Sequence, residues 1–236
     1  MSFTSANRTT APSKGVPLLR DGDRLTQKEF HRRYEAYPGD TKFELIGGVV
    51  YVASPLKRQH GSGHVDLGGV FWLYKNATPG TEALDNTTTI LGEESEPQPD
   101  LTLRVLPEWG GQSGTTKDDY VEGPAELLAQ IAGSTRRLDL GARKLDYERA
   151  GVVEYLVVSV KEQELYWFDL KTGESLKPDR KGIFQSKVFP GLWINPQGLF
   201  GRAALLLSTL QKGLASREHA AFVKRLQAAH RKRKNA

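Results

Sequence analysis

Asp100, Gln130 and Lys144 are the residues whose types and positions suggest chemistry in this sequence. Asp100 begins a predicted strand directly after a proline, Gln130 lies within the next predicted strand, and Lys144 lies on the helix that follows. Neighbouring strands hold side chains close together, and a returning helix can bring an ammonium group beside them. Oxygen ligands bind Mg²⁺, which activates water and stabilises phosphodiester oxyanions, while a lysine offsets charge. The layout therefore indicates phosphodiester hydrolysis.

Histidine and cysteine chemistry has less support. The sequence contains no cysteine, which excludes disulfides, thiolate zinc sites, iron–sulfur clusters and cysteine nucleophiles. His60 and His64 have the i,i+4 spacing of a metal-binding pair on a helix. However, Gly61 stands where the HExxH motif has glutamate, and no acidic third ligand follows at a known spacing. We therefore do not expect a zinc site there.

Hydrolase and nucleotide motifs are also missing. The segment at 111–114, GQSG, is not the strand-to-helix elbow that a serine nucleophile needs. Gly61-Ser62-Gly63 has neither the later glycine nor the preceding strand of a phosphate or dinucleotide loop. We expect no use of ATP or NAD.

Length and composition indicate a globular protein. The chain has 236 residues, of which 38% are hydrophobic and 26% charged, enough to form one α/β domain with tails. No apolar run approaches the roughly 20 residues of a membrane helix, and residues 1–15 lack the apolar centre of a secretory signal. We expect a cytoplasmic protein without membrane contact.

The positive charge is concentrated at the end of the chain. The formal net charge is +5, but residues 224–236 hold six lysines and arginines and no acid, which leaves the remainder near neutral. Charge runs at termini are usually solvated, so we expect a frayed helix end. The alternative is a tail with non-specific affinity for phosphates.

Periodicity predicts the elements that must position the three residues. We expect a flexible lead at 1–23, a domain at 24–213, and a carboxy-terminal helix with a basic tail at 214–236. Residues 107–123 should form a long functional or mobile loop. The predicted helices are 27–37, 55–75, 136–150, 200–214 and 217–232, and the predicted strands are a hairpin at 43–54, short strands near 83 and 87–91, and strands at 101–105, 125–132, 152–160 and 164–175.

Three segments carry a resemblance to a known family. PQPDLTLRV at 97–105, AQIAGSTRRLDLGARKLDYERAGVVEYLVV at 129–158 and FELIGGVVYVASPLKRQH at 43–60 resemble the Uma-type restriction endonucleases of the PD-(D/E)XK nuclease superfamily. The resemblance covers about residues 24–228. It implies a restriction-endonuclease-like fold, with a mixed β-sheet flanked by helices and a carboxy-terminal helical extension. It also implies a bacterial endonuclease that cuts DNA with Mg²⁺ or Mn²⁺.

The resemblance assigns the catalytic residues. Asp100 matches the superfamily aspartate, and Gln130 falls at the second acid of the strand motif. The lysine, which in this group lies on the following helix, falls at Lys144, or at Arg143 when counted from Asp139. An amide at Gln130 lends an oxygen to a metal but supplies no charge and cannot act as a base. Metal affinity should therefore fall.

Two further carboxylates could compensate for Gln130 as metal ligands. Glu44 matches a recurrent acidic position in the family's hairpin, and Asp139 lies near the start of the helix. Glu126 lies on the same strand face but too far along the strand to substitute, at about 13 Å. The expected metal ligands are thus Asp100 and Gln130, with Glu44 or Asp139.

The sequence is also consistent with two other functions. The chain could be an inactive nuclease-fold module that binds DNA or a protein partner, because Gln130 has removed the metal-binding acid. It could also form a homodimer through its carboxy-terminal helices.

Overall fold

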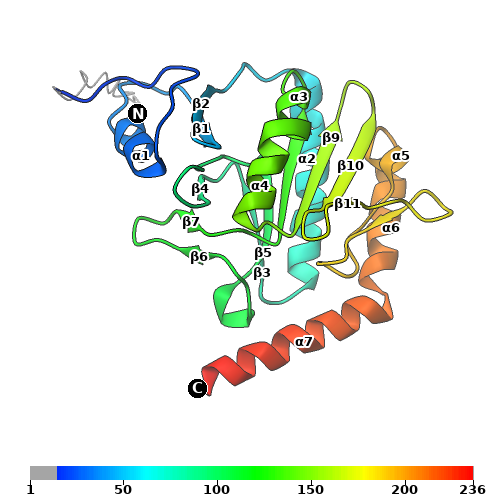
Figure 1. The fold of residues 1–236 in the computed structure, drawn as a ribbon. Helices are drawn as coiled ribbons and strands as arrows, with labels where there is room; N and C mark the ends of the chain where they lie inside the picture. Colours follow the sequence, from blue (N-terminus) through cyan, green and yellow to red (C-terminus); the bar gives the residue numbers. More distant parts are fainter. Residues whose placement is uncertain (1–14, 236) are drawn as a thin grey trace, which may run out of the picture.

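The computed structural model describes residues 15–235 and centres on a mixed β-sheet (Figure 1). In this sheet β8 and β9 run parallel, and the other neighbouring strands run antiparallel. The sheet confirms the expected α/β class and the predicted strands around 101–105, 125–132 and 152–160. Across the sheet, the order is β11 (Glu174–Ser175), β10 (Glu164–Asp169), β9 (Glu154–Ser159), β8 (Leu127–Ala132), β5 (Leu101–Val105) and β3 (Thr81–Asp85).

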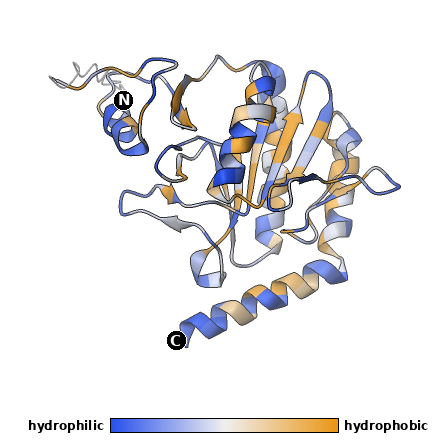
Figure 2. Ribbon diagram, in the orientation of Figure 1, coloured by the Kyte–Doolittle hydropathy of each residue, from blue (hydrophilic) through white to orange (hydrophobic). Residues whose placement is uncertain are grey.

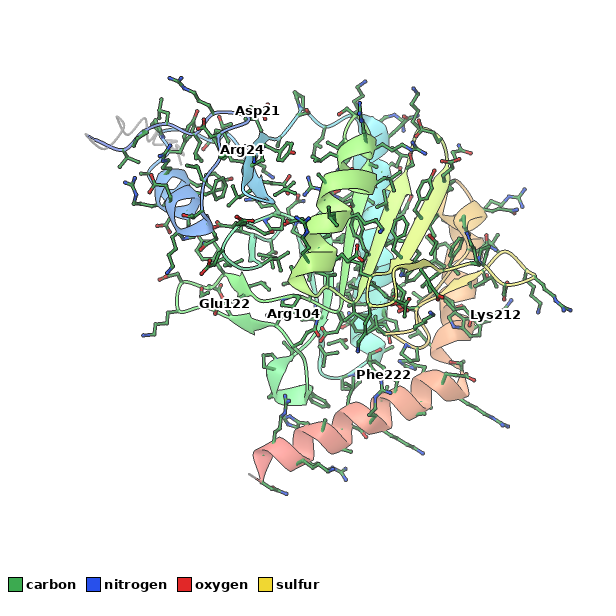
Figure 3. All side chains as sticks on the ribbon, viewed as in Figure 1. Asp21, Arg24, Arg104, Glu122, Lys212 and Phe222 are labelled. Carbon is green, nitrogen blue, oxygen red and sulfur yellow. The ribbon has the colours of Figure 1, made fainter. Side chains whose placement is uncertain are left out.

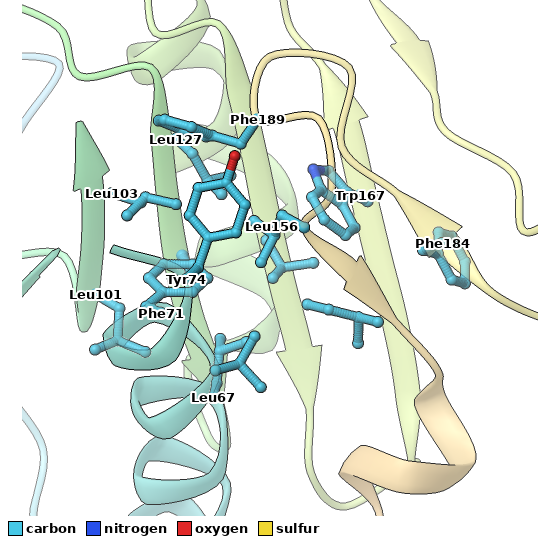
Figure 4. Packing of buried hydrophobic residues seen from close by; sticks show 14 of the residues in the cluster. Leu67, Phe71, Tyr74, Leu101, Leu103, Leu127, Leu156, Trp167, Phe184 and Phe189 are labelled. Atoms are coloured by element: carbon cyan, nitrogen blue, oxygen red, sulfur yellow. The ribbon is translucent and has the colours of Figure 1, made fainter. Parts of the chain in front are cut away.

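The central strands β8 and β9 are apolar over most of their length and buried at every position. Alternate residues face opposite sides of the sheet, so Leu127 joins the core under α2 while Leu128 joins the core that contains Tyr147. Figure 4 shows the first core, in which Phe71 and Tyr74 of α2 lie near the leucines of the sheet. Hydrophobic residues concentrate on the central strands in Figure 2.

Helices cover both faces of the sheet (Figure 1). On one face lies α2 (Arg58–Ala77), which forms despite four glycines because its apolar residues are buried against the sheet. On the other lies a continuous helical segment made of α3 (Arg136–Leu138), a π-helical stretch (Asp139–Arg143) and α4 (Lys144–Ala150). Gly151 ends it in the left-handed region, as predicted, with φ 90°.

The amino-terminal part packs as a separate small core. It contains α1 (Gln27–Glu35) and the hairpin of β1 (Phe43–Ile46) and β2 (Val49–Val52), whose turn uses positive φ at Gly47 and Gly48. The flexible lead predicted for 1–23 is wrong for its described part, because Leu19 is buried in this core and Gly22 N donates to Val50 O. Residues 1–14 lie outside the described residues.

The carboxy-terminal helices are α5 (Pro196–Leu199), α6 (Ala203–Leu214) and α7 (Arg217–Lys234). The prediction of a frayed end is wrong, because the ring of His230 stacks on Trp109 at 4.3 Å between centroids and anchors the last turns of α7. Phe222, labelled in Figure 3, is buried in the main core together with Leu210 of α6. The buried faces of α6 and α7 are therefore used within the chain, and the homodimer stays a prediction.

The predicted loop at 107–123 contains short elements. They are a 3₁₀ turn (Pro107–Trp109), β6 (Gly114–Thr115) and β7 (Val121–Glu122), which form a small sheet with β4 (Thr89–Ile90). Arg104 fastens this sheet by donating to Gly114 O at 2.7 Å. A further hairpin joins β12 (Phe184–Gln185) and β13 (Trp193–Ile194). Within residues 15–235, none of the helices has the length and apolarity needed to cross a membrane.

Candidate functional site

A cavity of about 790 Å³ lies beyond the carboxyl ends of β8 and β9. Its walls come from the segments that leave β2, β8 and β9, from the first turn of α2, and from the π-helical stretch. In open α/β sheets, the carboxyl ends of parallel strands are where ligands bind. Asp100, Gln130, Glu44 and Arg143 all line this cavity. The fold therefore brings most of the predicted site residues together.

Asp100 occupies the start of β5. The antiparallel register pairs Leu101 with Ala129, so one further step places Asp100 opposite Gln130. Asp100 is a buried residue whose side chain is 12% exposed, and its Oδ2 accepts a hydrogen bond from Ile131 N at 2.7 Å. Among the described residues, no lysine or arginine forms an ion pair with it. Its charge is therefore available to a ligand in the cavity.

Gln130 lies on the face of β8 turned toward α4. Its Nε2 donates to Tyr147 Oη at 3.4 Å, which fixes the amide and leaves its acceptor end, Oε1, for a ligand. Burial raises the pKa of Tyr147, so its phenol stays neutral and can serve this amide. The geometry thus supports the sequence-based role of Gln130 as a neutral oxygen donor beside Asp100, a role that stays a prediction.

The guanidinium of Arg143 lies at the cavity. Its Nη1 and Nη2 donate to the two oxygens of Glu44 at 2.7 and 2.8 Å, and its Nε donates to Asp139 Oδ1 at 2.9 Å. Glu44 Oε1 also accepts from Gln98 N at 2.8 Å, and Asp139 Oδ2 accepts from Thr135 Oγ1 at 2.6 Å. Both carboxylates expected as metal ligands therefore already have strong partners.

Burial controls the electrostatics of this group. It raises the pKa of Asp139, although the guanidinium of Arg143 acts in the opposite direction. For Arg143, burial favours a lower pKa, but the charge of Glu44 and the bonds to its carboxylate raise the pKa well above the ordinary value. Arg143 therefore stays charged between its two acidic partners.

Lys144, which the sequence had predicted as the cation of the site, does not line the cavity. Its Nζ is 3.9 Å from Glu148 Oε2 and 4.9 Å from the centroid of the Phe168 ring. The reason is the π-helical stretch at Asp139–Arg143, because its wider turn changes which residues share a face. The alternative position that counting from Asp139 allowed, Arg143, is the one at the cavity.

His60 and His64 were rejected from the sequence for want of an acidic third ligand. The structure supplies one from β5, since His60, His64 and Asp100 each offer a ligand atom and these atoms lie within 4.8 Å of one another. His60 Nε2 is 3.4 Å from Asp100 Oδ2. A search by spacing along the sequence cannot find this group, because the acid lies on another element.

The rim of the cavity is more basic than its interior. Lys42, Lys57 and Lys161 are exposed, Arg136 is half-buried, and the exposed acids among the lining residues are Asp40 and Glu162. Cations around an acidic interior favour the approach of a polyanion whose phosphates stay at the rim.

Glu126, which sequence spacing had excluded as a metal ligand, does not line the cavity. Its Oε2 accepts a hydrogen bond from Val105 N at 2.8 Å.

Two comparisons with known proteins give matches, one to the sequence and one to the fold. The Uma2 family model, described as "Putative restriction endonuclease", matches residues 28–197. A solved structure described as a "putative nuclease belonging to DUF820" from Anabaena variabilis is similar with a TM-score of 0.59 and 12% identity. The match covers 79% of this chain and 99% of that chain, and at this identity it shows the fold alone. No curated protein matches the sequence significantly.

Proposed function

The chain belongs to the Uma2 family of restriction-endonuclease-like proteins, and from that premise we propose that it is a metal-dependent endonuclease that hydrolyses DNA at the cavity around Asp100. The proposal rests on the burial and the pairing of the Asp100 carboxylate. Its carboxylate is buried, fixed by Ile131 N, and not paired with a lysine or arginine in the described part of the chain. A buried charge of this kind is costly unless a ligand compensates it.

The donor set at the cavity fits a divalent cation. Asp100 supplies a carboxylate, Gln130 supplies an amide oxygen opposite it, and His60 has a buried Nδ1 that makes no hydrogen bond within residues 15–235. Glu44 and Asp139 are less suited, because Arg143 already binds both. Such a cation, when bound, supplies Lewis acidity toward a phosphate oxygen and lowers the pKa of a water.

Residues of the chain have separate parts in the proposed reaction. Asp100 holds the cation, and Gln130 completes the oxygen donors without adding charge. Arg143 uses three of its five N–H groups on Glu44 and Asp139, which leaves two to donate to a phosphate oxygen. Rim cations such as Lys42 and Lys57 hold the neighbouring phosphates of DNA, so binding should weaken as salt concentration rises.

Plasmid nicking tests the proposal. We expect the wild-type protein to convert supercoiled plasmid to nicked or linear DNA with a divalent cation, and Asp100→Ala to lose this activity while it still unfolds cooperatively. The assay is run with Mg²⁺, Mn²⁺ and Zn²⁺ and at low and high salt. Failure of the wild type to cut with any of the three cations would remove the enzyme proposal.

A second candidate function is an inactive nuclease-fold module that binds DNA or a protein partner. The observation that favours it is Gln130, where an amide replaces the acid expected at the position opposite Asp100. Calorimetry of Gln130→Glu separates the two functions. For an active enzyme, the wild type already binds Mn²⁺ and the variant binds about tenfold more tightly because a second charge is added. Binding by the variant alone would support the inactive module.

A further inference from the structure

Two histidines lie beside Asp100, and the proposed reaction uses only His60, as one donor to the cation. His60 and His64 lie four residues apart at the start of α2, so their rings lie on one side of the helix, with centroids 5.8 Å apart. Asp100 reaches them from β5, and the ligand atoms of the three residues lie within 4.8 Å of one another. Two ligands of a tetrahedral ion, at bonds of about 2.1 Å, lie about 3.4 Å apart. His60 Nε2 and Asp100 Oδ2 already have this separation, at 3.4 Å, and the His64 ring must move closer to complete the group.

One nitrogen of each histidine is buried without a hydrogen bond. His60 Nδ1 and His64 Nε2 are buried without a hydrogen-bond partner within residues 15–235. His64 Nε2 does lie 2.6 Å from Asp85 Oδ1, but the pair is not aligned for a hydrogen bond. A buried polar atom left unpaired destabilises a fold. A bound cation would give one nitrogen of each ring a partner.

A simple ion pair between His60 and Asp100 explains the geometry less well. The His60 Nε2 to Asp100 Oδ2 distance is 3.4 Å, whereas a charge-assisted hydrogen bond is usually about 2.7–2.9 Å. The extra separation is in the direction expected when a cation is shared between the two groups.

Supporting contacts around the group resemble those of metal sites. Asp100 Oδ2 is oriented by Ile131 N, and the carboxylate of Asp85 lies against His64. Metal-binding histidines usually contact a carboxylate or carbonyl with the nitrogen that does not bind the ion, and ligating carboxylates are themselves hydrogen-bonded. Because Asp85 contacts Nε2 of His64, the nitrogen that His64 would offer to an ion is Nδ1. Asp85 is exposed at the end of β3, so it can adjust its position when His64 turns toward an ion.

The ligand types determine which cation fits. Imidazole nitrogens suit Zn²⁺, Co²⁺, Ni²⁺ and Mn²⁺ to different degrees, whereas Mg²⁺ strongly prefers oxygen ligands and retained waters. Two imidazoles and one carboxylate, with an open side toward the cavity, form a typical three-ligand set for zinc with room for a further ligand. We infer that His60, His64 and Asp100 bind a transition-metal cation of the Zn²⁺ class in preference to Mg²⁺. The inference rests on the proposed function only for the catalytic role of the bound ion.

Titration with metal alone, without DNA, tests this inference. The full chain is first treated with a chelator and then titrated with Zn²⁺ or Mg²⁺ in a calorimeter, and with Co²⁺ while visible absorption is recorded. We expect one Zn²⁺ per chain, cobalt bands typical of nitrogen and oxygen ligands, and no comparable heat with Mg²⁺. Loss of an outer-shell partner weakens metal binding about 10–100-fold, and we expect His64→Gln, which removes a ligand, to exceed tenfold.

Matched variants keep the outcome decisive. His230→Gln removes a histidine that stacks on Trp109 far along the chain, and we expect it to bind Zn²⁺ as the wild type does. Thermal unfolding of each apo variant by circular dichroism shows whether the fold is kept, and His60→Gln provides a second ligand variant if His64→Gln unfolds. Absence of Zn²⁺ binding by the wild type, or equal binding by the ligand variants and His230→Gln, would overturn the inference.

The two proposals can fail independently. Plasmid nicking with Mg²⁺ and no Zn²⁺ binding would overturn the transition-metal site but keep the nuclease. Zn²⁺ binding that depends on His64, with no nicking in any metal, would keep the site and remove the nuclease.

Discussion

Two clusters of charged and titratable side chains reach the same cavity, each through two of its members, and they differ in whether their members satisfy one another. In the first, Arg143 is bonded to Glu44 and Asp139, and we call these three residues the closed cluster. In the second, Asp100 lies beside His60 and His64 at longer or misaligned distances, and we call these three the open cluster. Both are largely buried. Burial and charge are common to both clusters, so what distinguishes the proposed ligand site is its unmet bonding capacity.

The closed cluster is suited to positioning. A planar guanidinium bonds one carboxylate with two parallel N–H groups and a second carboxylate with its Nε. This arrangement ties the β1 hairpin to the π-helical stretch, two segments 99 residues apart in sequence. The open cluster instead holds an uncompensated carboxylate, as expected where stability is given up for ligand binding.

The largest predicted effect breaks the closed cluster. Arg143→Met leaves Glu44 and Asp139 buried without their cation, which should lower the free energy of unfolding by about 3–5 kcal/mol. Lys144→Met is the matched control, because Lys144 makes only peripheral contacts and should change stability by about 0.5 kcal/mol or less. Urea unfolding measures both. Equal effects of the two substitutions would show that the Arg143 contacts do not stabilise the fold.

A smaller effect is predicted in the open cluster. Asp100→Asn keeps an oxygen that can accept from Ile131 N and removes an uncompensated buried charge. We expect the unfolding free energy of the apo protein to stay within about 1 kcal/mol of wild type, or to rise, because functional residues often reduce stability. The same urea experiment provides the value. A loss as large as that of Arg143→Met would mean that Asp100 is part of a closed network as well.

The smallest predicted effect concerns Glu126, a buried carboxylate that accepts hydrogen bonds from two backbone N–H groups. Burial raises the pKa of Glu126, against hydrogen bonds from Val105 N and Gln112 N. The folded state therefore binds the Glu126 proton more tightly than the unfolded state. The contribution of this proton to the free energy of unfolding is complete below the unfolded pKa of about 4.3, and it is lost as pH rises through the folded pKa.

Glu126→Gln removes that titration. The unfolding free energy of the wild type minus that of Glu126→Gln should consequently decrease between about pH 4 and pH 7, as measured by urea unfolding at each pH. The difference between the two proteins is compared, so other titrating groups cancel. A constant or increasing difference would contradict the assigned direction.

Local sequence patterns predicted much of the fold and part of the site. The apolar runs of β8 and β9 were found because buried strands are continuous in sequence, and β5 was found from the alternation of its apolar residues. In the structure, the register of these strands places Asp100 opposite Gln130. Gly151 was found as a helix end because a positive φ favours glycine. These features depend on residues that are neighbours along the chain or on adjacent strands.

Other features depend on contacts that a single sequence does not display. Arg143 rather than Lys144 reaches the cavity because of a π-helical stretch, which ordinary helical spacing does not anticipate. The acid near His60 comes from another element, 40 residues later. The charged tail forms a docked helix because Trp109 provides a surface for His230. Each miss arose where tertiary packing overrode a local pattern.

Anomalous diffraction from crystals soaked with Zn²⁺ and measured across the zinc absorption edge tests the central claim most directly. The account predicts a peak between Asp100, His60 and His64, on the cavity side of β5, and none between Glu44 and Asp139. A peak in the closed cluster, or none beside Asp100, would contradict it.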